Sequence, residues 1–125
     1  SNIINNSLNP IINLHISYLP YNRGAHPNYW SFVDKTPKGV SIHKIDRGVD
    51  TGPIYIQKKV NYTKKDTLNS FYIKLKIEIE RLFLDNFKKI ILGEIKPSVQ
   101  KGKGSFHKKS DLPKNLNWNI NVNKL

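Results

Sequence analysis

The chain has 125 residues, and its 21 Lys and Arg residues against 9 Asp and Glu residues give a formal net charge of +12. No stretch approaches the roughly 20 consecutive apolar residues of a membrane-spanning helix, and the lack of cysteine excludes disulfides and thiolate chemistry. The length fits one domain, so we expect a globular unit in a reducing compartment, the cytoplasm, with no membrane partner.

Apolar patterning predicts three strands. Residues 11–16 form a short β-branched run that is typical of a buried strand. Residues 39–45 alternate between faces, and a second alternating run covers residues 54–60. The segment IDRGVDTGP connects these two runs, which predicts an antiparallel hairpin.

Two helices are also predicted. The stretch LPYNRGAHP is typical of an ordered loop, and a short helix follows it from about Asn28. Asp66 is the expected N-cap of a long helix that ends at Gly93. The apolar residues of this long helix recur at spacings of three and four: Leu68, Phe71, Leu75, Ile79, Leu82, Phe83, Phe87, Ile90 and Ile91. The periodicity disappears beyond Pro97.

One set of polar residues points to chemistry. Asn13 and His15 stand two apart on the first strand, so their side chains leave the same face. Asp50 lies in a glycine-flanked loop at the end of a strand, where ligands of α/β sheets bind. Acyl transfer to an amine needs donors for a developing oxyanion and a group that accepts a proton, and an amide, an imidazole and a carboxylate supply these.

Each of these residues also has a purely structural interpretation: a strand-end amide, a histidine with satisfied hydrogen bonds, and a turn carboxylate. A metal site is a weaker alternative, because no ligand-spacing signature accompanies its candidate ligands, which are His15, His43, Asp46 and Asp50. We therefore expect no metal.

Two linked motifs resemble the folate-dependent formyltransferases. The run NLHISYLP at residues 13–20, followed by RGA at 23–25, resembles the N-x-H-P-S-L-L-P and R-G segment of that family, with Ile16 in place of the usual proline. The runs GVSIHKID at 39–46 and GVDTGPI at 48–54 are similar to its G-V-T-x-H strand and D-x-G-x-I loop, in the same order and spacing.

The resemblance implies a formyltransferase with catalytic Asn13, His15 and Asp50. In this scheme Asn13 and His15 hydrogen-bond the formyl oxygen, while Asp50 orients His15 and helps to remove the amine proton. His43 matches a family histidine and is expected to support the sheet or the catalytic loop. The implied donor is 10-formyltetrahydrofolate, whose pterin is expected against the loop of Ile45, Asp46, Arg47, Gly48 and Val49.

The resemblance also implies a fold. Residues 1–97 correspond to the C-terminal part of a Rossmann-like formyltransferase domain, an α/β fold with a mostly parallel sheet, an antiparallel hairpin and one long helix. Residues 98–125 are expected to form an irregular basic extension. The N-terminal half of that domain has no counterpart here and methionine is absent even from position 1, so we expect a piece of a longer chain. Related enzymes suggest a homodimer.

The expected acceptor is a nucleotide-linked amino sugar. Residues 21–32 and 36–39 resemble enzymes that N-formylate such sugars for surface polysaccharide, including lipopolysaccharide and O-antigen. The run GKGSFH at 102–107 resembles a short segment of the same enzymes, and a Gly-rich basic turn can hold phosphate. The predicted acceptor contacts are His26, Tyr29, Lys38, Lys103 and Ser105.

Two other functions stay open. Methionyl-tRNA formyltransferase would use the +12 charge to bind a polyanion, although the chain has no room for the C-terminal β-barrel of that class. A non-catalytic basic module that binds nucleotide or RNA would make the same polar residues structural. The lysines are scattered through the chain, which favours a solvated surface, so nucleic acid is not the expected partner.

Overall fold

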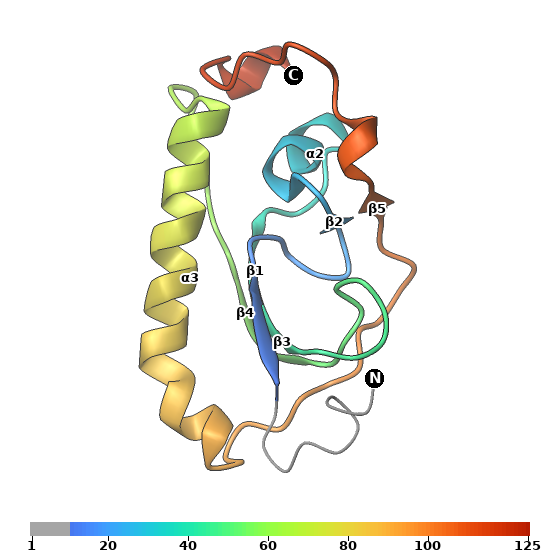
Figure 1. The fold of residues 1–125 in the computed structure, drawn as a ribbon. Helices are drawn as coiled ribbons and strands as arrows, with labels where there is room; N and C mark the ends of the chain where they lie inside the picture. The colour runs from blue at the N-terminus through green and yellow to red at the C-terminus, as the bar shows by residue number, and fades with distance from the viewer. Residues whose placement is uncertain (1–10) are drawn as a thin grey trace.

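The computed structural model describes residues 11–125, which form two small sheets and two α-helices (Figure 1). The larger sheet has the strand order β1-β3-β4, with β1 at Ile12–His15, β3 at Gly39–Lys44 and β4 at Ile54–Lys59. The smaller sheet pairs β2 (Arg23–Gly24) with β5 (Phe106–His107) in parallel.

The α/β class and the antiparallel hairpin of β3 and β4 agree with the prediction, but the larger sheet is not mostly parallel. In the described residues β1 also pairs antiparallel with β3, and Asn13 lies opposite His43. The parallel pairing lies instead between β2 and β5. Sequence alternation reports which face of a strand is buried and says nothing about the direction of a neighbouring strand, so the patterns could not distinguish the two arrangements.

The long helix α3 runs over Leu68–Ile91 and begins one residue later than predicted. Its N-cap is Thr67, whose side chain accepts from the N–H of Ser70 in a capping box. Asp66, the predicted N-cap, instead accepts a hydrogen bond from the N–H of Thr63. At the other end Gly93 takes the left-handed conformation with φ 74°, and its N–H donates to the carbonyl of Ile90, as expected of a C-terminal cap.

The core lies between the larger sheet and α3. Val40 and Ile42 are fully buried on one face of β3, and the intervening residues Ser41 and His43 therefore point to the other face. The second helix, α2 (Pro27–Val33), adds its own aromatic side chains to this core. The buried partners of the strand residues are Tyr29, Phe32, Leu68, Phe71, Leu75, Ile79 and Ile90. Burial of these apolar groups fixes which face of β3 carries polar residues.

Residues 98–125 pack onto this core. They contain β5 and two 3-10 helices, η1 (Lys109–Asp111) and η2 (Val122–Lys124). Val122 is buried against the core and joins the segment to it. Among residues 11–125, no helix combines the length and the apolar character needed to cross a bilayer.

Candidate active site

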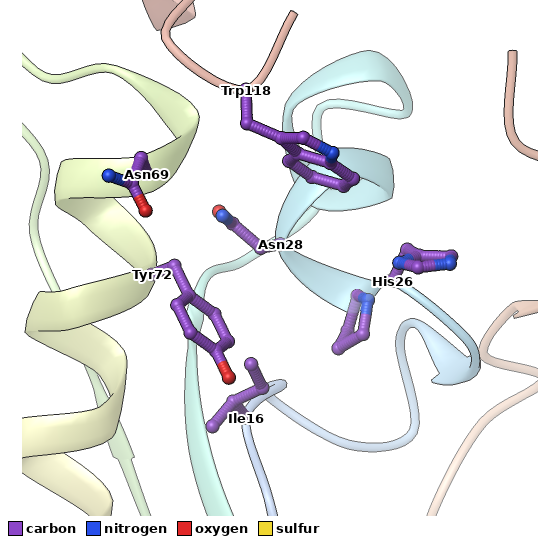
Figure 2. A pocket seen from close by; sticks show the side chains of 7 residues that line it. Ile16, His26, Asn28, Asn69, Tyr72 and Trp118 are labelled. Carbon is purple, nitrogen blue, oxygen red and sulfur yellow. The ribbon is translucent and has the colours of Figure 1, made fainter. Parts of the chain in front are cut away.

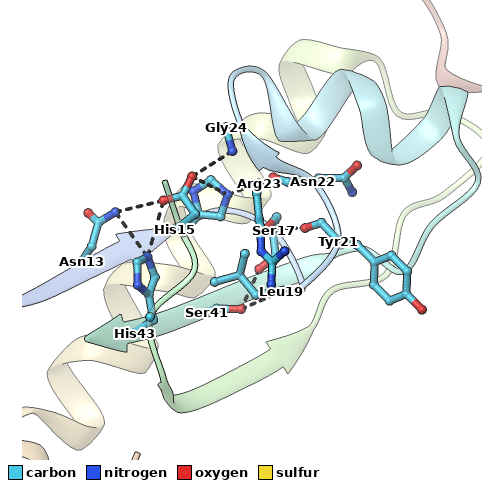
Figure 3. Close-up of polar contacts among 12 residues, drawn as sticks. Asn13, His15, Ser17, Leu19, Tyr21, Asn22, Arg23, Gly24, Ser41 and His43 are labelled. Carbon is cyan, nitrogen blue, oxygen red and sulfur yellow. Dashed lines mark hydrogen bonds and ion pairs between the residues drawn. The ribbon is translucent and has the colours of Figure 1, made fainter. Parts of the chain in front are cut away.

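Four polar side chains from three parts of the chain meet on the face of the sheet that carries His43 (Figure 3). Nδ2 of Asn13 donates to Oδ1 of Asp50 at 3.5 Å. Nε2 of His15 lies 3.7 Å from Oδ2 of Asp50, and Nε2 of His43 lies 3.5 Å from Oδ1. The structure thus brings together Asn13, His15 and Asp50, the three residues proposed for catalysis, and adds His43 beside them.

The carboxylate of Asp50 is held by the backbone as well as by side chains. The N–H of Gly24 donates to Oδ2 of Asp50 at 2.9 Å, across a separation of 26 residues. Asp50 itself has φ 57°, in the left-handed region that aspartate adopts more readily than most residues. The loop therefore holds this carboxylate in one orientation toward the two histidines.

Backbone carbonyls set the tautomers of both histidines. Nε2 of His15 lies 3.0 Å from the carbonyl oxygen of Asn22, which can only accept, so Nε2 carries a hydrogen. In neutral His15 the lone pair is then on Nδ1. Nδ1 of His43 donates in the same way to the carbonyl of Lys44 at 3.0 Å, which leaves the Nε2 of neutral His43 as an acceptor.

The pKa shifts of these groups follow from burial and from their contacts. Burial lowers the pKa of His15, and the charge of Asp50 opposes this only in part. Burial alone would lower the pKa of His43, but its hydrogen bonds to Asp50 and to the Lys44 carbonyl raise it overall. Burial alone would raise the pKa of Asp50, but the His43 hydrogen bond, a positive charge on His15 whenever that ring is protonated, and the Gly24 N–H lower it overall. The site therefore holds an ionised carboxylate beside a neutral His15.

The loop predicted to hold the pterin, residues 45–49, leads directly into Asp50 and is mostly exposed. Asp46 shapes it, because its Oδ1 accepts from the N–H of Gly48 at 2.9 Å and from the hydroxyl of Thr51 at 2.7 Å. Val49 is 57% exposed at the tip. An exposed loop with an apolar tip beside the Asp50 carboxylate suits a planar heterocycle, and the binding role of this loop stays a prediction.

Two of the predicted acceptor contacts, Tyr29 and Lys38, already have partners within the protein. Tyr29 is buried in the core, where its ring packs edge-on against Trp30. Nζ of Lys38 donates to the carbonyls of Ser31 and Thr36, both at 3.0 Å, and burial lowers its pKa. The Lys38 contacts tie α2 to the segment that precedes β3. Both side chains thus have a structural role, and their part in binding an acceptor stays a prediction.

The predicted contacts from the C-terminal segment are also engaged within the protein. The hydroxyl of Ser105 accepts from the N–H of Asn22 at 2.8 Å. Lys103 is exposed, and its carbonyl accepts from Nη1 of Arg23 at 3.5 Å. Ser105 therefore braces the loop that carries Gly24, whereas the ammonium group of Lys103 remains available to an anionic acceptor.

His26 lines a pocket between α2 and α3, with a volume of about 400 Å³ (Figure 2). Its ring lies 5.7 Å from that of Trp118, and Tyr72 forms the α3 side of the pocket. Asn28 also lines it, with 4% of its surface exposed. Nδ2 of Asn28 donates to the carbonyl of Leu68, while its Oδ1 has no hydrogen-bond partner among the described residues.

The sequence did not reveal the groups that support the four-residue cluster of Asn13, His15, His43 and Asp50. These are the N–H of Gly24, the carbonyl of Asn22 and the side chain of Gln100, whose Nε2 donates to the carbonyls of Asp50 and Gly52. They act through the backbone or over long sequence separations, so no local pattern could have identified them. Across residues 11–125, no three His, Cys, Asp or Glu side chains are grouped so that they could hold a metal ion.

Known proteins share the sequence pattern and the fold of this chain. The profile of the family described as formyl transferase matches residues 1–85. The formyltransferase PseJ from Anoxybacillus kamchatkensis, solved with UDP-4,6-dideoxy-4-formamido-L-AltNAc and tetrahydrofolate, is 47% identical with a TM-score of 0.84, over 90% of this chain and 62% of that one.

Two curated relatives are each 35% identical. A methionyl-tRNA formyltransferase of Thermodesulfovibrio yellowstonii aligns over 91% of this chain and 38% of its own length. A dTDP-4-amino-4,6-dideoxyglucose formyltransferase of Mycobacterium bovis aligns over 81% of this chain and 43% of its own length. The chain thus spans about two fifths of the length of these relatives.

Proposed function

Because this chain belongs to the formyl transferase family, we propose that the complete protein moves a formyl group from 10-formyltetrahydrofolate to the amino group of a nucleotide-linked amino sugar. One observation carries the proposal: the carboxylate of Asp50 contacts His15, His43 and the N–H of Gly24, with the Asn13 amide beside it. This is the donor and base set that transfer of an acyl group to an amine requires.

In the proposed reaction the amine nitrogen attacks the formyl carbon and a new C–N bond forms. The carbonyl oxygen becomes an oxyanion, and Nδ2 of Asn13 donates a hydrogen bond to it. The tetrahedral intermediate then collapses with cleavage of the bond between the formyl carbon and the folate nitrogen. The proton lost by the amine ends on that departing nitrogen, so the transfer needs no other reactant.

His15 is the group that we assign to proton transfer. Neutral His15 has its lone pair on Nδ1 and can take the amine proton there, and the Asp50 carboxylate 3.7 Å away stabilises the resulting imidazolium. Asp50 is a poor base itself because its contacts lower its pKa. This differs from the sequence-based scheme, in which Asp50 helped to remove the proton and His15 bonded the formyl oxygen.

The choice of a sugar acceptor draws support from the comparisons. PseJ, at 47% identity, was solved with a UDP-linked formamido sugar and tetrahydrofolate, whereas the tRNA-modifying relative is 35% identical. We extend the proposal to a cytoplasmic enzyme of surface polysaccharide synthesis, including lipopolysaccharide and O-antigen. The expected homodimer stays a prediction from the resemblance, and the expected absence of nucleic acid among the partners stays a prediction from the scattered lysines.

Methionyl-tRNA is the second candidate acceptor. A methionyl-tRNA formyltransferase matches 91% of this chain, and a net charge of +12 would attract a polyanion. The positively charged surface therefore gives this alternative a physical basis.

An assay on the complete protein separates the two acceptors. The protein is incubated with 10-formyltetrahydrofolate and either UDP- or dTDP-linked amino sugars or charged initiator tRNA, and the formylated product is measured by mass spectrometry. We expect formylation of an amino sugar and none of the tRNA. Formylation of tRNA alone would replace the sugar proposal with the alternative, and no formylation of any amine would end the proposed activity.

A further inference from the structure

The side-chain amide of Gln100 joins the loop of Asp50 to the loop of Arg23. Its Nε2 donates to the carbonyls of Asp50 and Gly52, at 2.8 and 2.9 Å. Its Oε1 accepts from Nε and Nη2 of Arg23, at 3.1 and 2.7 Å. A carboxamide has two N–H hydrogens and one oxygen with two lone pairs, so these four bonds use the full capacity of the side chain.

Together with a bond from Gly24, these contacts form a closed circuit of interactions that includes the Asp50 carboxylate. Gly24 follows Arg23 in the chain, and its N–H donates to Oδ2 of Asp50 at 2.9 Å. Arg23 in turn binds Gln100, which binds the carbonyl of Asp50. One side chain thus fixes both the backbone of Asp50 and the segment whose N–H orients its carboxylate.

The segment that carries Gln100 is itself fixed on both sides. Before it, Ser98 and Ile54 exchange two backbone hydrogen bonds, each of 2.8 Å. After it, the N–H of Arg23 donates to the carbonyl of Ser105 at 2.9 Å. Gln100 is half-buried between these anchors. Its amide is therefore a rigid support, held by residues that lie far apart in the sequence.

Asp50 needs such a support because of its own backbone. Its φ of 57° is in the left-handed region, which a residue with a side chain keeps only when its surroundings impose it. The carbonyl oxygens that accept from Gln100 belong to Asp50 and to Gly52, two residues later, so Gln100 holds the C-terminal side of this turn. Without them the turn can relax, and the carboxylate then loses its fixed distance from the two histidines.

We propose that Gln100 is a positioning residue that sets where the Asp50 carboxylate stands relative to His15 and His43. The inference deepens the proposed function and rests on it. Gln100 bonds the backbone of the loop and not the carboxylate, the amide or the histidines of the cluster. Its loss therefore changes kcat far more than the KM for the acceptor.

Two variants of the complete protein test this role. Gln100→Met keeps the length of the side chain and removes all four hydrogen bonds, while Gln100→Glu keeps the acceptor for Arg23 and removes both N–H donors. We expect each to lower kcat by about tenfold to a hundredfold, with KM within about twofold, as for small displacements of a catalytic group. Val99→Ala is the control, since this neighbour is 77% exposed, and we expect wild-type kinetics.

Histidine titration by NMR gives a readout that does not depend on activity. Contacts with Asp50 raise the pKa of His43, so displacement of the carboxylate in Gln100→Met should lower that pKa. A variant with lower thermal stability but unchanged histidine titration and kcat would overturn the proposal, because Gln100 would then only support folding. If the wild-type protein formylates no amine, the proposed function fails, and the titration alone decides whether Gln100 positions Asp50.

Discussion

The Asn13 amide and the His43 imidazole lie at partner positions of β1 and β3, with Nδ2 of the first 3.4 Å from Nε2 of the second. The same Nδ2 lies 3.5 Å from Oδ1 of Asp50. Both distances are at the limit of hydrogen bonding. The amide is thus oriented by its neighbours but only weakly bonded to them, which leaves its N–H groups available to a developing oxyanion.

The first prediction concerns this amide. Asn13→Ala should lower kcat of the complete protein by about 10² to 10³-fold, because removal of one oxyanion donor costs about 2.7 to 4 kcal/mol of transition-state stabilisation. The KM for the acceptor should change little, since the donor acts mainly on charge that develops in the transition state. Steady-state kinetics measure both quantities. A loss of less than about fivefold would make Asn13 a structural residue of the sheet.

The second prediction is the pH dependence of catalysis. Burial lowers the pKa of His15 below its usual value of 6.5, so the imidazole stays neutral at more acidic pH than a free histidine. If neutral His15 accepts the amine proton, kcat/KM should fall with decreasing pH only below 6.5. A pH-rate profile measures the midpoint of this acid limb. A midpoint above 6.5 would contradict the assignment of His15 as the base.

The third prediction separates the charge of Asp50 from its shape. Asp50→Asn is nearly isosteric and removes the charge that partly raises the pKa of His15, so the acid limb should move to still lower pH. The same change removes the partner of the imidazolium, and kcat should fall by about 10² to 10⁴-fold. Asp85→Asn, at an exposed position of α3, is the control and should change neither the pH of the acid limb nor kcat. An acid limb that moves to higher pH would contradict the proposed coupling.

The fourth prediction concerns stability. The buried Asp66 accepts from Nζ of Lys74 at 2.6 Å, from Ser70 at 2.7 Å and from the N–H of Thr63 at 2.8 Å. Burial alone would raise the pKa of Asp66, but these bonds lower it overall. Its stabilising contribution is therefore complete above the unfolded pKa of 3.8 and is lost as pH falls through the lower folded value.

We accordingly expect Asp66→Ala to reduce the free energy of unfolding at neutral pH by about 1 to 3 kcal/mol, because it leaves the Thr63 N–H without its acceptor. The loss should shrink in acid. Denaturant titrations of the complete protein at several pH values measure it, with Asp85→Ala as the exposed control. Equal losses for the two variants would show that Asp66 contributes no more than a surface charge.

The fold could be predicted where one periodic pattern dominates a segment. The long helix is such a case, and its error at the N-terminus was one residue, because both Asp66 and Thr67 are suitable caps and only the contacts with Thr63 and Lys74 assign Asp66 elsewhere. The direction of β1 relative to β3 could not be predicted, since it depends on the path of the intervening loop and short helix rather than on any strand residue.

For the candidate site, the motifs identified which side chains to examine but not what holds them. The spacing of Asn13 and His15 predicts a common face, and the glycine-flanked loop predicts a carboxylate near it. Gly24 and Gln100 support that carboxylate across 26 and 50 residues, and a glycine N–H or a lone glutamine gives no sequence signal for such a contact. The sequence suggested Tyr29 as a sugar contact. In the structure its large apolar ring is buried in the core, where removal of apolar surface from water stabilises the fold.

The last prediction follows from the close approach of Gly52 to the end of β3. A Cβ on Gly52 would lie 1.6 Å from the carbonyl oxygen of Lys44 and 3.4 Å from Nδ1 of His43. Gly52→Ala must therefore push the loop away from the strand, which disturbs the hydrogen bond of His43 to that carbonyl as well as the Asp50 turn. Overpacking of this kind costs about 1 to 3 kcal/mol of stability, and we expect a similar loss here.

Catalysis distinguishes this change from general destabilisation. Gly93→Ala is the matched control, because Gly93 has φ 74° at the end of α3, where an added Cβ meets no atom within 4 Å but is strained by about 1 to 2 kcal/mol. Both variants should lose stability in thermal unfolding, but only Gly52→Ala should lose most of its kcat. A Gly52→Ala protein with wild-type kcat would mean that the exact position of the loop does not control the reaction, because the displaced carboxylate would still serve His15.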